Sequence, residues 1–414
     1  MCCGNSDSKK NGLNNMKKKK LIQINTVCNG STGNLMRQIQ LAAQEKGYDT
    51  LSFYGRRKGY ADLPCKRFGS FLGFWLHVIW TTLTDRHGLG SRIATGKMVE
   101  ELRKERPDII HLHNLHGYYL NYPILFKFLR EEFKGKIVWT FHDCWPITGH
   151  CPHFIIRQCD KWKNQCDKCP NKENYPISYF LDSSKDNYRL KKKLFTNMEN
   201  LTILCPSQWM LDIVKQSFLA DTKAVVVPNG IDLKIFYPRK QYKDIEKYHI
   251  PRDKKVILGV ASVWEERKGL STFIRLAKEL EESYVIVLVG LSRIQLKKMN
   301  PSMIGIRRTE NKEELAQLYS RANVFLNPSE EESFSLVTVE AMACGTPAVV
   351  LDSSAVKELV NEETGVVLHH PKLKDYIRAI SICENKKAVK DIERYSVKGM
   401  TDKIMEIYEG NILV

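Results

Sequence analysis

Acidic residues are scarce in this chain relative to basic ones: 47 Asp and Glu against 64 Lys and Arg leave a formal net charge of +17. Long apolar runs are also missing. No segment reaches the roughly eighteen apolar residues that a membrane-spanning helix needs, and the nearest, residues 68–83, is interrupted by His77. We therefore expect a soluble or peripheral protein with anionic partners such as phosphates or acidic membranes.

The amino-terminal residues also lack a recognisable targeting signal. The stretch MCCGNSDSKKNGLNNM has no apolar core of a signal peptide, and Gly4 is misplaced for N-myristoylation. We expect 1–16 to be a disordered extension. Without an export signal, the twelve cysteines are expected to be reduced thiols in the cytoplasm, and peripheral contact at the inner face of the plasma membrane is the alternative location.

Short β-branched runs alternate with longer segments of helical period, which predicts βαβ crossovers and parallel sheets. The pattern occurs twice, on either side of the turn-rich segment 228–255. We predict an α/β protein with Rossmann-like doubly wound domains at 17–235 and 236–395 facing a central cleft, followed by a helix in 396–414. The expected strands lie at 21–27, 50–54, 108–113, 136–142, 202–206, 224–228, 256–262, 284–290, 324–328 and 348–352.

Residues that follow the strands carry most of the functional information, because ligands bind at the carboxyl ends of parallel strands. Gly30 and Gly33 precede a predicted helix, where backbone N–H groups favour a phosphate, although any tight strand-to-helix turn also needs glycine. Arg267 and Lys268 stand before another helix and are suited to neutralising a diphosphate. A solvated helix start is the alternative for these two cations.

Histidines cluster after two neighbouring strands. His111 and His113 point to the same side of one strand, and we expect them in the core or the cleft wall rather than at a metal. His142 ends the next strand and is followed directly by Asp143. A strand-end histidine beside a carboxylate is suited to contacting a reacting group, and a structural histidine is the alternative.

Four of the cysteines fall together with the spacing C-x7-C-x6-C-x2-C: Cys151, Cys159, Cys166 and Cys169. The final C-x2-C is a common half of a tetrahedral zinc site, so we favour a structural zinc ion over a redox pair or unrelated thiols. Four protein ligands leave no open coordination position, and no catalytic role is expected for this metal.

Two glutamates stand eight residues apart in SEEESFSLVTVEAMACGTP, residues 329–347. Glu332 is predicted in a loop, and Glu340 in a short helix over 334–344 that ends before Gly345. Glu340 lies near enough to the cleft to accept hydrogen bonds. The acidic run from Glu330 to Glu332 has the composition of an ordinary surface.

Together these motifs resemble the retaining glycosyltransferases of family 4, which have the GT-B fold. More narrowly, the chain is similar to a bacterial branch assigned to exopolysaccharide, capsule or colanic-acid-like biosynthesis, from about residue 21 to the carboxyl terminus. The motifs that carry the resemblance are the glutamate pair with AMACGTPAVV, the RKGL segment, PNGID at 228–232, HD at 142–143, HLHNLHGYYLNY, TFHDCWPITGHC, DRHGLGS and the cysteine cluster.

The resemblance implies roles for three of the residues above. Glu340 would hold the nucleotide ribose hydroxyls, for which a carboxylate is a natural acceptor. Glu332 would lie by the donor sugar and stabilise an oxocarbenium-like centre, and His142 would lie at the reacting centre and acceptor side. Ser333 stands where many relatives have glycine, a departure that affects the contact to the sugar.

The family also implies a clamp on the departing diphosphate. Lys268 with Arg267 would bind it, aided by the N–H groups after Gly30 and Gly33. The arginine that the family usually places five residues before the lysine is Val263 here, so the exact set of cations differs from the family pattern. Because cations and helix dipoles neutralise the leaving group, no metal cofactor is expected for catalysis.

A glycosyltransferase of this kind would take a UDP- or GDP-linked sugar and a saccharide or lipid-linked acceptor. Its last helix would cross back onto the first domain. An epimerase or hydrolase of nucleotide sugars on the same scaffold is an alternative that needs no acceptor. A zinc-containing nucleic-acid-binding protein is a further one, but the cations are dispersed and no recognition motif surrounds the cysteines, so no nucleic-acid partner is expected.

The apolar segment 68–83 is the remaining feature. It puts Leu72, Leu76, Ile79 and Leu83 on one helical face. We expect a buried helix. The alternative is contact with an anionic membrane, supported by the basic residues Lys17 to Lys20.

Overall fold

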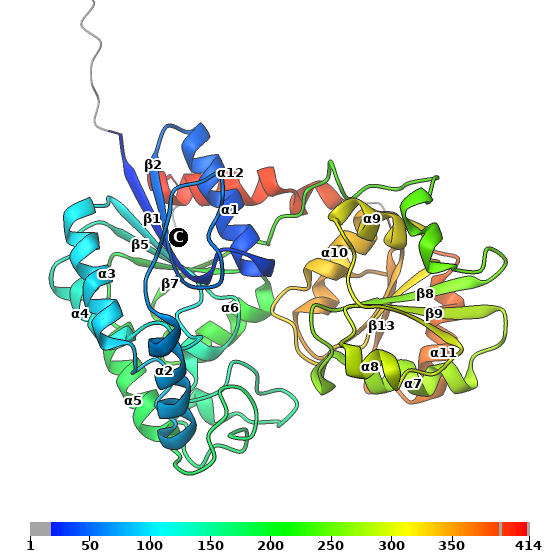
Figure 1. The fold of residues 1–414 in the computed structure, drawn as a ribbon, viewed down its shortest axis with the longest axis horizontal. Coiled ribbons are helices and arrows are strands. Elements are labelled where there is room, and N and C mark those ends of the chain that lie inside the picture. The colour runs from blue at the N-terminus through cyan, green and yellow to red at the C-terminus, as the bar shows by residue number, and fades with distance from the viewer. Residues whose placement is uncertain (1–17, 389–390, 412–414) are drawn as a thin grey trace, which may run out of the picture.

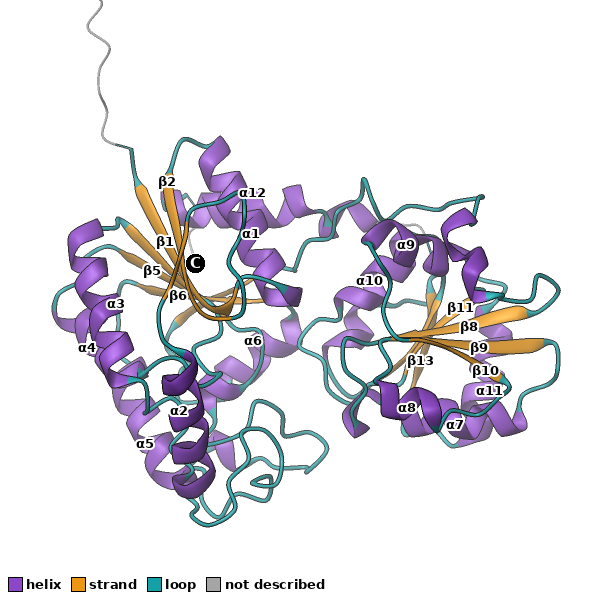
Figure 2. Ribbon diagram, viewed as in Figure 1, coloured by secondary structure: helices purple, strands orange, loops and turns teal. Residues whose placement is uncertain are grey.

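The computed structural model describes residues 18–388 and 391–411, so the predicted extension 1–16 lies outside the described residues. Two lobes are seen side by side, each a twisted parallel sheet covered by helices on both faces (Figures 1 and 2). The predicted GT-B arrangement of two Rossmann-like domains is therefore present. All ten predicted strands form at or within about two residues of the expected positions.

The first sheet has the order β3-β2-β1-β4-β5-β6-β7, and all its neighbours are parallel. Its strand Lys20–Val27 pairs Ile22 with Leu51 on one side and with Ile110 on the other. Apolar residues buried on both faces are typical of such a covered sheet. The strands are β1 (Lys20–Val27), β2 (Asp49–Arg56), β3 (Cys65–Arg67), β4 (Ile109–Leu112), β5 (Lys136–Thr140), β6 (Leu201–Cys205) and β7 (Lys223–Val226).

The second sheet repeats the same plan in the order β10-β9-β8-β11-β12-β13. In both sheets the first strand in the chain sits between the second and a later one, so the strand order reverses there. Crevices at such reversal points are where open α/β sheets bind ligands. The strands are β8 (Lys255–Val260), β9 (Tyr284–Val289), β10 (Met303–Ile306), β11 (Val324–Asn327), β12 (Ala348–Leu351) and β13 (Gly365–Leu368).

Amphipathic helices connect the strands and supply the outer layers. Polar caps set several of their starts: the side chain of Ser207 accepts from the N–H of Met210, and that of Asn311 from Glu314. In the first lobe the helices are α1 (Gly30–Glu45), α2 (Phe71–Thr84), α3 (Arg92–Glu105), α4 (Tyr122–Glu131), α5 (Ser184–Phe195) and α6 (Gln208–Lys215). In the second they are α7 (Leu270–Glu279), α8 (Arg293–Lys297), α9 (Lys312–Arg321), α10 (Leu336–Ala343) and α11 (Leu373–Cys383).

Helix α12 (Val397–Glu409) leaves the second lobe and packs against α1 of the first, as the adjacent red and blue ribbons show (Figure 1). Met400 and Ile404 share a buried apolar cluster with Leu35 and Ile39 of α1. The Tyr408 hydroxyl also lies 2.5 Å from Nδ1 of the buried His111. The chain therefore joins the two lobes at a second place besides the segment between β7 and β8.

Helix α2 corrects one sequence expectation. Only His77 and Thr81 of this helix are buried, and seven of its large apolar side chains are exposed, so the expectation of a buried helix is wrong. The helix carries apolar residues nearly all round, and one face finds no protein partner among the described residues. None of the helices in the described ranges combines the length and hydropathy that crossing a membrane requires.

Candidate active site

The loop after β11 in the second lobe meets the loops after β5 and β6 in the first. Ser333 makes this contact: its Oγ donates to the carbonyl of His142 at 2.7 Å, and its own carbonyl accepts from Ser207 Oγ at 2.8 Å. The carboxyl ends of the two sheets therefore face each other across a seam, as two such domains are expected to do. Ser333, which departs from the family pattern, is a direct link between the lobes.

His142 lies half-buried at this seam, held by a chain of hydrogen bonds. Its Nε2 is 3.1 Å from Nδ1 of His113, whose Nε2 is 3.1 Å from Oε1 of Gln23. The side-chain nitrogen of Gln23 donates to the carbonyl of Met36, so its oxygen is the acceptor. His113 therefore carries its proton on Nε2, and His142 donates to it through Nε2.

This tautomer leaves the lone pair of His142 on Nδ1. Burial lowers the pKa of His142 to about 4, against the opposing charge of Asp143, so the ring is neutral near neutral pH. The ring stacks on His113 with centroids 5.3 Å apart, and His113 stacks on His111 at 4.3 Å. His111 and His113 are fully buried, as predicted for core or cleft-wall residues. A fixed neutral ring with its Nδ1 lone pair available can accept a hydrogen bond from a hydroxyl.

Asp143 is directed away from His142. Its carboxylate accepts from His116 Nε2 at 2.7 Å and from the N–H of Trp145 at 2.9 Å. Burial raises the pKa of Asp143, but His116 and these hydrogen bonds outweigh it and bring the pKa down to about 2. Asp143 thus orients His116, whose Nδ1 in turn lies 3.0 Å from the Tyr175 hydroxyl.

The predicted phosphate-binding cations lie next to the acidic loop. Arg267 and Lys268 belong to a one-turn 3-10 helix, Glu266–Lys268, that follows β8. Lys268 Nζ forms an ion pair with Glu332, whose side chain is 12% exposed, and Arg267 donates to the carbonyl of Glu331. Burial raises the pKa of Glu332, but the charges of Lys268 and Arg267 outweigh it, so the net shift is downward.

Glu331 is a site residue that the sequence analysis missed. Its carboxylate is buried and accepts from the N–H groups of Phe154 and Ile155 at 2.9 and 2.8 Å, with His153 Nδ1 at 3.3 Å. These donors belong to the cysteine-rich segment of the other lobe. The surface interpretation of the acidic run is therefore wrong for Glu331, which holds the loop bearing Glu332 against the first lobe. No local sequence pattern distinguishes it from its neighbours.

Glu340 lies on α10, which begins two residues later than predicted, after Ser335 with its left-handed φ of 84°. Its carboxylate accepts from the Tyr319 hydroxyl at 3.0 Å. Burial raises the pKa of Glu340 to about 7, opposed by Tyr319 and Lys312. The carboxylates of Glu340 and Glu332 thus have different partners, and the structure gives each a separate environment.

Gly30 and Gly33 open α1 directly after β1. Gly30 has a φ of 72°, and a Cβ on Gly33 would lie 2.3 Å from the carbonyl carbon of Cys28. The Tyr60 hydroxyl donates to the carbonyl of Gly33 at 2.7 Å. Backbone conformation and close packing therefore account for both glycines without a ligand. Phosphate binding by the N–H groups beside them remains a prediction.

Both halves of the chain match known protein families. Residues 44–235 match the family described as Glycosyltransferase Family 4, and residues 240–398 match Glycosyl transferases group 1. The chain belongs to the family 4 glycosyltransferases of the GT-B fold. The family and the fold inferred from the sequence motifs are thereby confirmed.

Among named relatives, this glycosyltransferase is 25% identical over 274 residues to the putative colanic acid biosynthesis glycosyl transferase WcaC of Escherichia coli. The match spans 64% of each chain, slightly less than two thirds of that relative. A D-inositol 3-phosphate glycosyltransferase of Corynebacterium jeikeium is 26% identical over 281 residues, 62% of this chain and 59% of that protein.

Solved structures support the fold over nearly the whole chain. Sucrose-phosphate synthase from Thermosynechococcus elongatus superposes with a TM-score of 0.71 at 17% identity, covering 95% of this glycosyltransferase and 99% of the other chain. HepE from Anabaena in complex with UDP-glucose gives a TM-score of 0.63 at 14% identity, covering 94% and 99%. At these identities the likeness shows the fold alone.

The four clustered cysteines of this glycosyltransferase line one small cavity of about 20 Å³, together with His150. Cys166 Sγ accepts from the N–H of Gly149 at 3.2 Å. Within residues 18–388 and 391–411, however, no three His, Cys, Asp or Glu side chains stand in an arrangement that could hold a metal ion. The fold thus brings the four thiols to one cavity, and zinc binding remains a prediction.

Proposed function

We propose that the protein transfers a sugar from a nucleotide-sugar donor, UDP- or GDP-linked, to a saccharide or lipid-linked saccharide acceptor, with retention of anomeric configuration. The proposed setting is bacterial surface polysaccharide biosynthesis, which the resemblance to WcaC supports. The location proposed with it is cytoplasmic, with peripheral contact to an anionic membrane.

One observation carries this proposal: the Ser333 hydroxyl is hydrogen-bonded to the carbonyl of His142. That bond sets the acidic loop of the second lobe, with Glu332 and its partner Lys268, beside the strand-end histidine of the first. A donor sugar between the lobes would meet a carboxylate and cations on one side and a neutral imidazole on the other. Charged donor-side groups and an acceptor-side hydrogen-bond acceptor are what a sugar transfer needs.

In the proposed reaction an acceptor hydroxyl attacks the anomeric carbon as the bond from that carbon to the diphosphate oxygen breaks. The bond electrons leave with the diphosphate, and the hydroxyl proton passes to a phosphate oxygen on the same face. Lys268 and Arg267 stabilise the negative charge that develops on the leaving group. Glu332 stabilises the positive charge that develops on the sugar ring. His142 accepts a hydrogen bond from a sugar hydroxyl through Nδ1.

Glu340 is proposed to hold the ribose hydroxyls of the donor. HepE, a structural neighbour, has been solved with UDP and with UDP-glucose, which supports a nucleotide-sugar donor for a chain of this fold. A carboxylate accepts two hydroxyl donors at once when it is ionised. Because burial brings the pKa of Glu340 to about 7, the ionised form dominates only above that pH.

Donor affinity is therefore expected to rise with pH. With a pKa of about 7, the ionised fraction of Glu340 is about ten times larger at pH 8 than at pH 6, so donor binding should be about tenfold tighter at pH 8. A thermal-shift screen of UDP- and GDP-sugars would first identify the donor. Calorimetric titration of that donor between pH 6 and pH 8 then measures the dependence.

In the Glu340→Gln variant the pH dependence should disappear and the affinity at pH 8 should fall. Glu279→Gln, on the exposed face of α7, is the matched control and should behave as wild type. A wild-type affinity that is constant across this range would contradict the assignment of Glu340. If no nucleotide sugar binds at all, the proposed function fails as a whole, and a donor consumed without any acceptor would favour a hydrolase or epimerase instead.

We also propose that Cys151, Cys159, Cys166 and Cys169 hold a structural zinc ion, supported by their shared cavity and by thiolate preference for zinc. Purified protein is expected to contain about one zinc per chain by elemental analysis. Cys166→Ser should lose the metal and lower the melting temperature. Cys65→Ser, outside the cluster, should retain it. If the wild-type protein contains no zinc and its melting temperature does not rise when zinc is added, the zinc assignment is wrong.

A further inference from the structure

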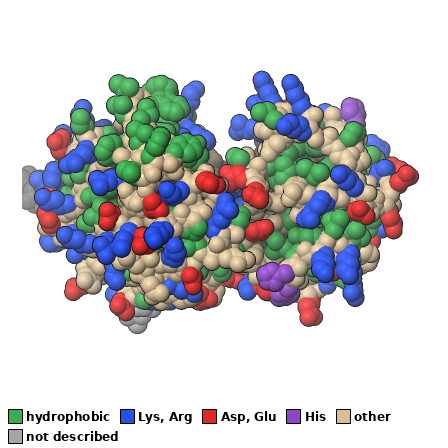
Figure 3. Space-filling view, turned by 90° about the horizontal axis from the view of Figure 1, so that it is seen from below, with side chains coloured by type: hydrophobic (Ala, Val, Ile, Leu, Met, Phe, Trp, Pro, Cys, Tyr) green, Lys and Arg blue, Asp and Glu red, His purple; other side chains and the backbone are tan. Residues whose placement is uncertain are grey.

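Helix α2 presents a contiguous apolar surface to solvent. Seven of its large side chains are between 44% and 74% exposed. Figure 3 shows hydrophobic side chains gathered in one raised patch on the first lobe, with basic side chains beside it. Exposed apolar patches of this kind mark sites of contact with other molecules. The residues are Phe71, Leu72, Trp75, Leu76, Ile79, Trp80 and Leu83.

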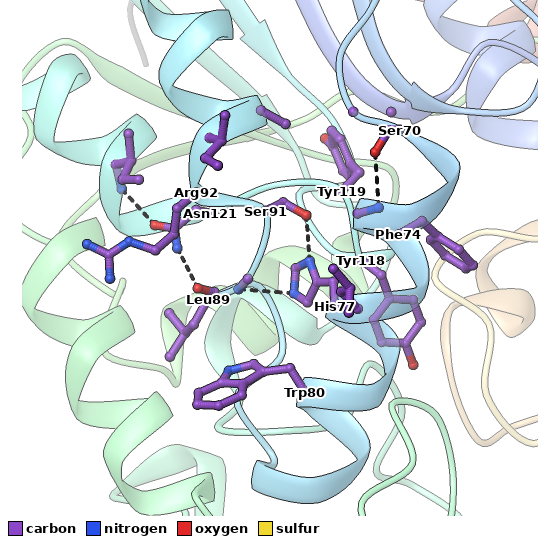
Figure 4. A pocket seen from close by; sticks show the side chains of 18 of the residues that line it. Ser70, Phe74, His77, Trp80, Leu89, Ser91, Arg92, Tyr118, Tyr119 and Asn121 are labelled. Carbon is purple, nitrogen blue, oxygen red and sulfur yellow. Dashed lines mark hydrogen bonds between the residues drawn. The ribbon is translucent and has the colours of Figure 1, made fainter.

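The inner side of α2 forms one wall of a large open pocket of about 1280 Å³ (Figure 4). Phe74, Leu76 and Trp80 of α2 line it, with Ile93 of α3 and Tyr118 of the loop before α4. The pocket exceeds the roughly 300–1,000 Å³ that a typical small-molecule site occupies. Its lining is mostly apolar, which suits a long hydrocarbon better than a sugar alone.

His77 fixes the floor of this pocket. Its Nε2 accepts from the N–H groups of Gly88 and Gly90 at 3.3 and 3.2 Å, so Nδ1 carries the proton and donates to Ser91 Oγ at 2.9 Å. Burial lowers the pKa of His77 to about 4, which keeps the ring neutral. Figure 4 shows the ring bridging α2 to the loop that holds Leu89 and Ser91. The pocket is therefore preformed.

Four cations also line the pocket: Arg86, Arg92, Lys97 and Lys127. All four are exposed. Within the part of the chain that the structure describes, none of their side chains forms an ion pair or a hydrogen bond. A pocket with an apolar interior and unneutralised cations at its edge is complementary to an amphiphile with an anionic head.

An aromatic wall leads from this pocket toward the candidate active site. Phe74 lies against Tyr118 with ring centroids 5.8 Å apart, and Tyr118 lies against Tyr175, again at 5.8 Å. The Tyr175 hydroxyl contacts His116, which is bound to Asp143, the neighbour of His142 in sequence. Side chains in contact thus lead from the pocket to Asp143, the residue that follows His142 in the chain.

We propose that this pocket binds the hydrocarbon chain of an anionic lipid whose head carries the acceptor saccharide, with the lipid phosphate at the four cations. The saccharide would then extend along Tyr118 and Tyr175 toward His142. This inference rests on the proposed function and narrows its acceptor to a phosphate-linked lipid. The outer face of α2, including Leu72, would rest in the membrane interface while the inner face holds one chain.

Single-chain alkyl phosphates, used below their critical micelle concentrations, are the probes for this site. Binding to the full chain is measured by calorimetry, without vesicles. The dissociation constant should fall about fourfold per added methylene until the pocket is filled, and then level off. Uncharged alcohols of the same chain lengths should bind at least tenfold more weakly.

Leu76 and Leu72 provide a matched pair of variants, since both are exposed leucines on α2 and only Leu76 lines the pocket. Leu76→Arg should weaken alkyl phosphate binding more than tenfold. Leu72→Arg should leave it unchanged and lower only co-sedimentation with vesicles of anionic phospholipid. Equal effects of the two variants, or affinity independent of chain length, would overturn the pocket assignment in favour of a general membrane surface.

Donor affinity measured on the same preparations separates this inference from the function on which it rests. Wild-type protein that binds a nucleotide sugar but no alkyl phosphate refutes the lipid pocket alone. Protein that binds alkyl phosphates with the expected chain-length dependence but no nucleotide sugar refutes the proposed transfer reaction and keeps the lipid site.

Discussion

Replacing His142 by alanine is expected to lower kcat about a hundredfold or more while changing donor affinity less than twofold. The reason lies in the hydrogen bonds that fix its tautomer. Gln23 and His113 hold the proton on Nε2, and Nδ1 keeps its lone pair. Because burial lowers the pKa of His142 to about 4, that lone pair is available throughout the physiological range. Initial rates with labelled donor, combined with calorimetry of donor binding, measure the two effects separately.

His369→Ala is the control for this variant, because the side chain of His369 is largely exposed and pairs with Asp352 in the second lobe. It should keep wild-type rates. His142→Gln retains a hydrogen-bond acceptor and should lose less activity than the alanine variant. A wild-type kcat in His142→Ala would reject its role at the reacting centre, and a loss confined to donor affinity would reassign it to donor binding.

Most of the fold could be predicted from the sequence, because buried parallel strands are rich in apolar residues. The runs at 136–142 and 284–290 are nearly continuous in apolar residues, as strands covered on both faces must be. The strands that were missed, β3, β10 and β13, are all at the edges of their sheets. An edge strand has one hydrogen-bonded neighbour and is less buried. These three strands are only three or four residues long, which is too short to show a clear apolar pattern in the sequence.

The sequence predicts several residues of the candidate site but not the contacts between them. Glu332, Lys268 and His142 were all identified, since they follow strands and match family motifs. The roles assigned to them still await experiment. Glu331 could not be distinguished from the flanking glutamates, because its two backbone donors, the N–H groups of Phe154 and Ile155, lie 177 and 176 positions away in the chain. Such partners depend on how the two lobes meet.

For helix α2 the sequence predicts the secondary structure but not the burial. Its apolar period was correctly identified as helical, yet the same pattern fits a helix buried in protein and one that faces lipid. The difference depends on whether neighbouring elements cover it, and here the helix that follows, α3, leaves Leu76 and Trp80 exposed. Sequence periodicity identifies the apolar face and not the material against which it packs.

Breaking the ion pair between Lys268 and Glu332 is expected to lower kcat/KM for the nucleotide-sugar donor. Their ion pair is largely shielded from solvent, with side chains 20% and 12% exposed. Lys268→Met removes the cation proposed to neutralise the diphosphate, so kcat/KM should fall about a hundredfold to a thousandfold. The same change leaves Glu332 with only the charge of Arg267 to offset its burial, which raises the pKa of Glu332 and destabilises the loop.

A double-mutant cycle tests whether the two side chains act together. Lys268→Met in a Glu332→Gln background should cost less stability than in wild type, with a coupling free energy of about 1 kcal/mol or more in denaturant titrations. Lys398→Met, which breaks the exposed Lys398–Asp402 pair on α12, should change neither kcat/KM nor stability measurably. Additive effects together with unchanged donor affinity would contradict the proposed clamp. If the pair is coupled and Lys268→Met also weakens donor binding, the diphosphate competes with Glu332 for Lys268, and donor binding frees the carboxylate to face the sugar.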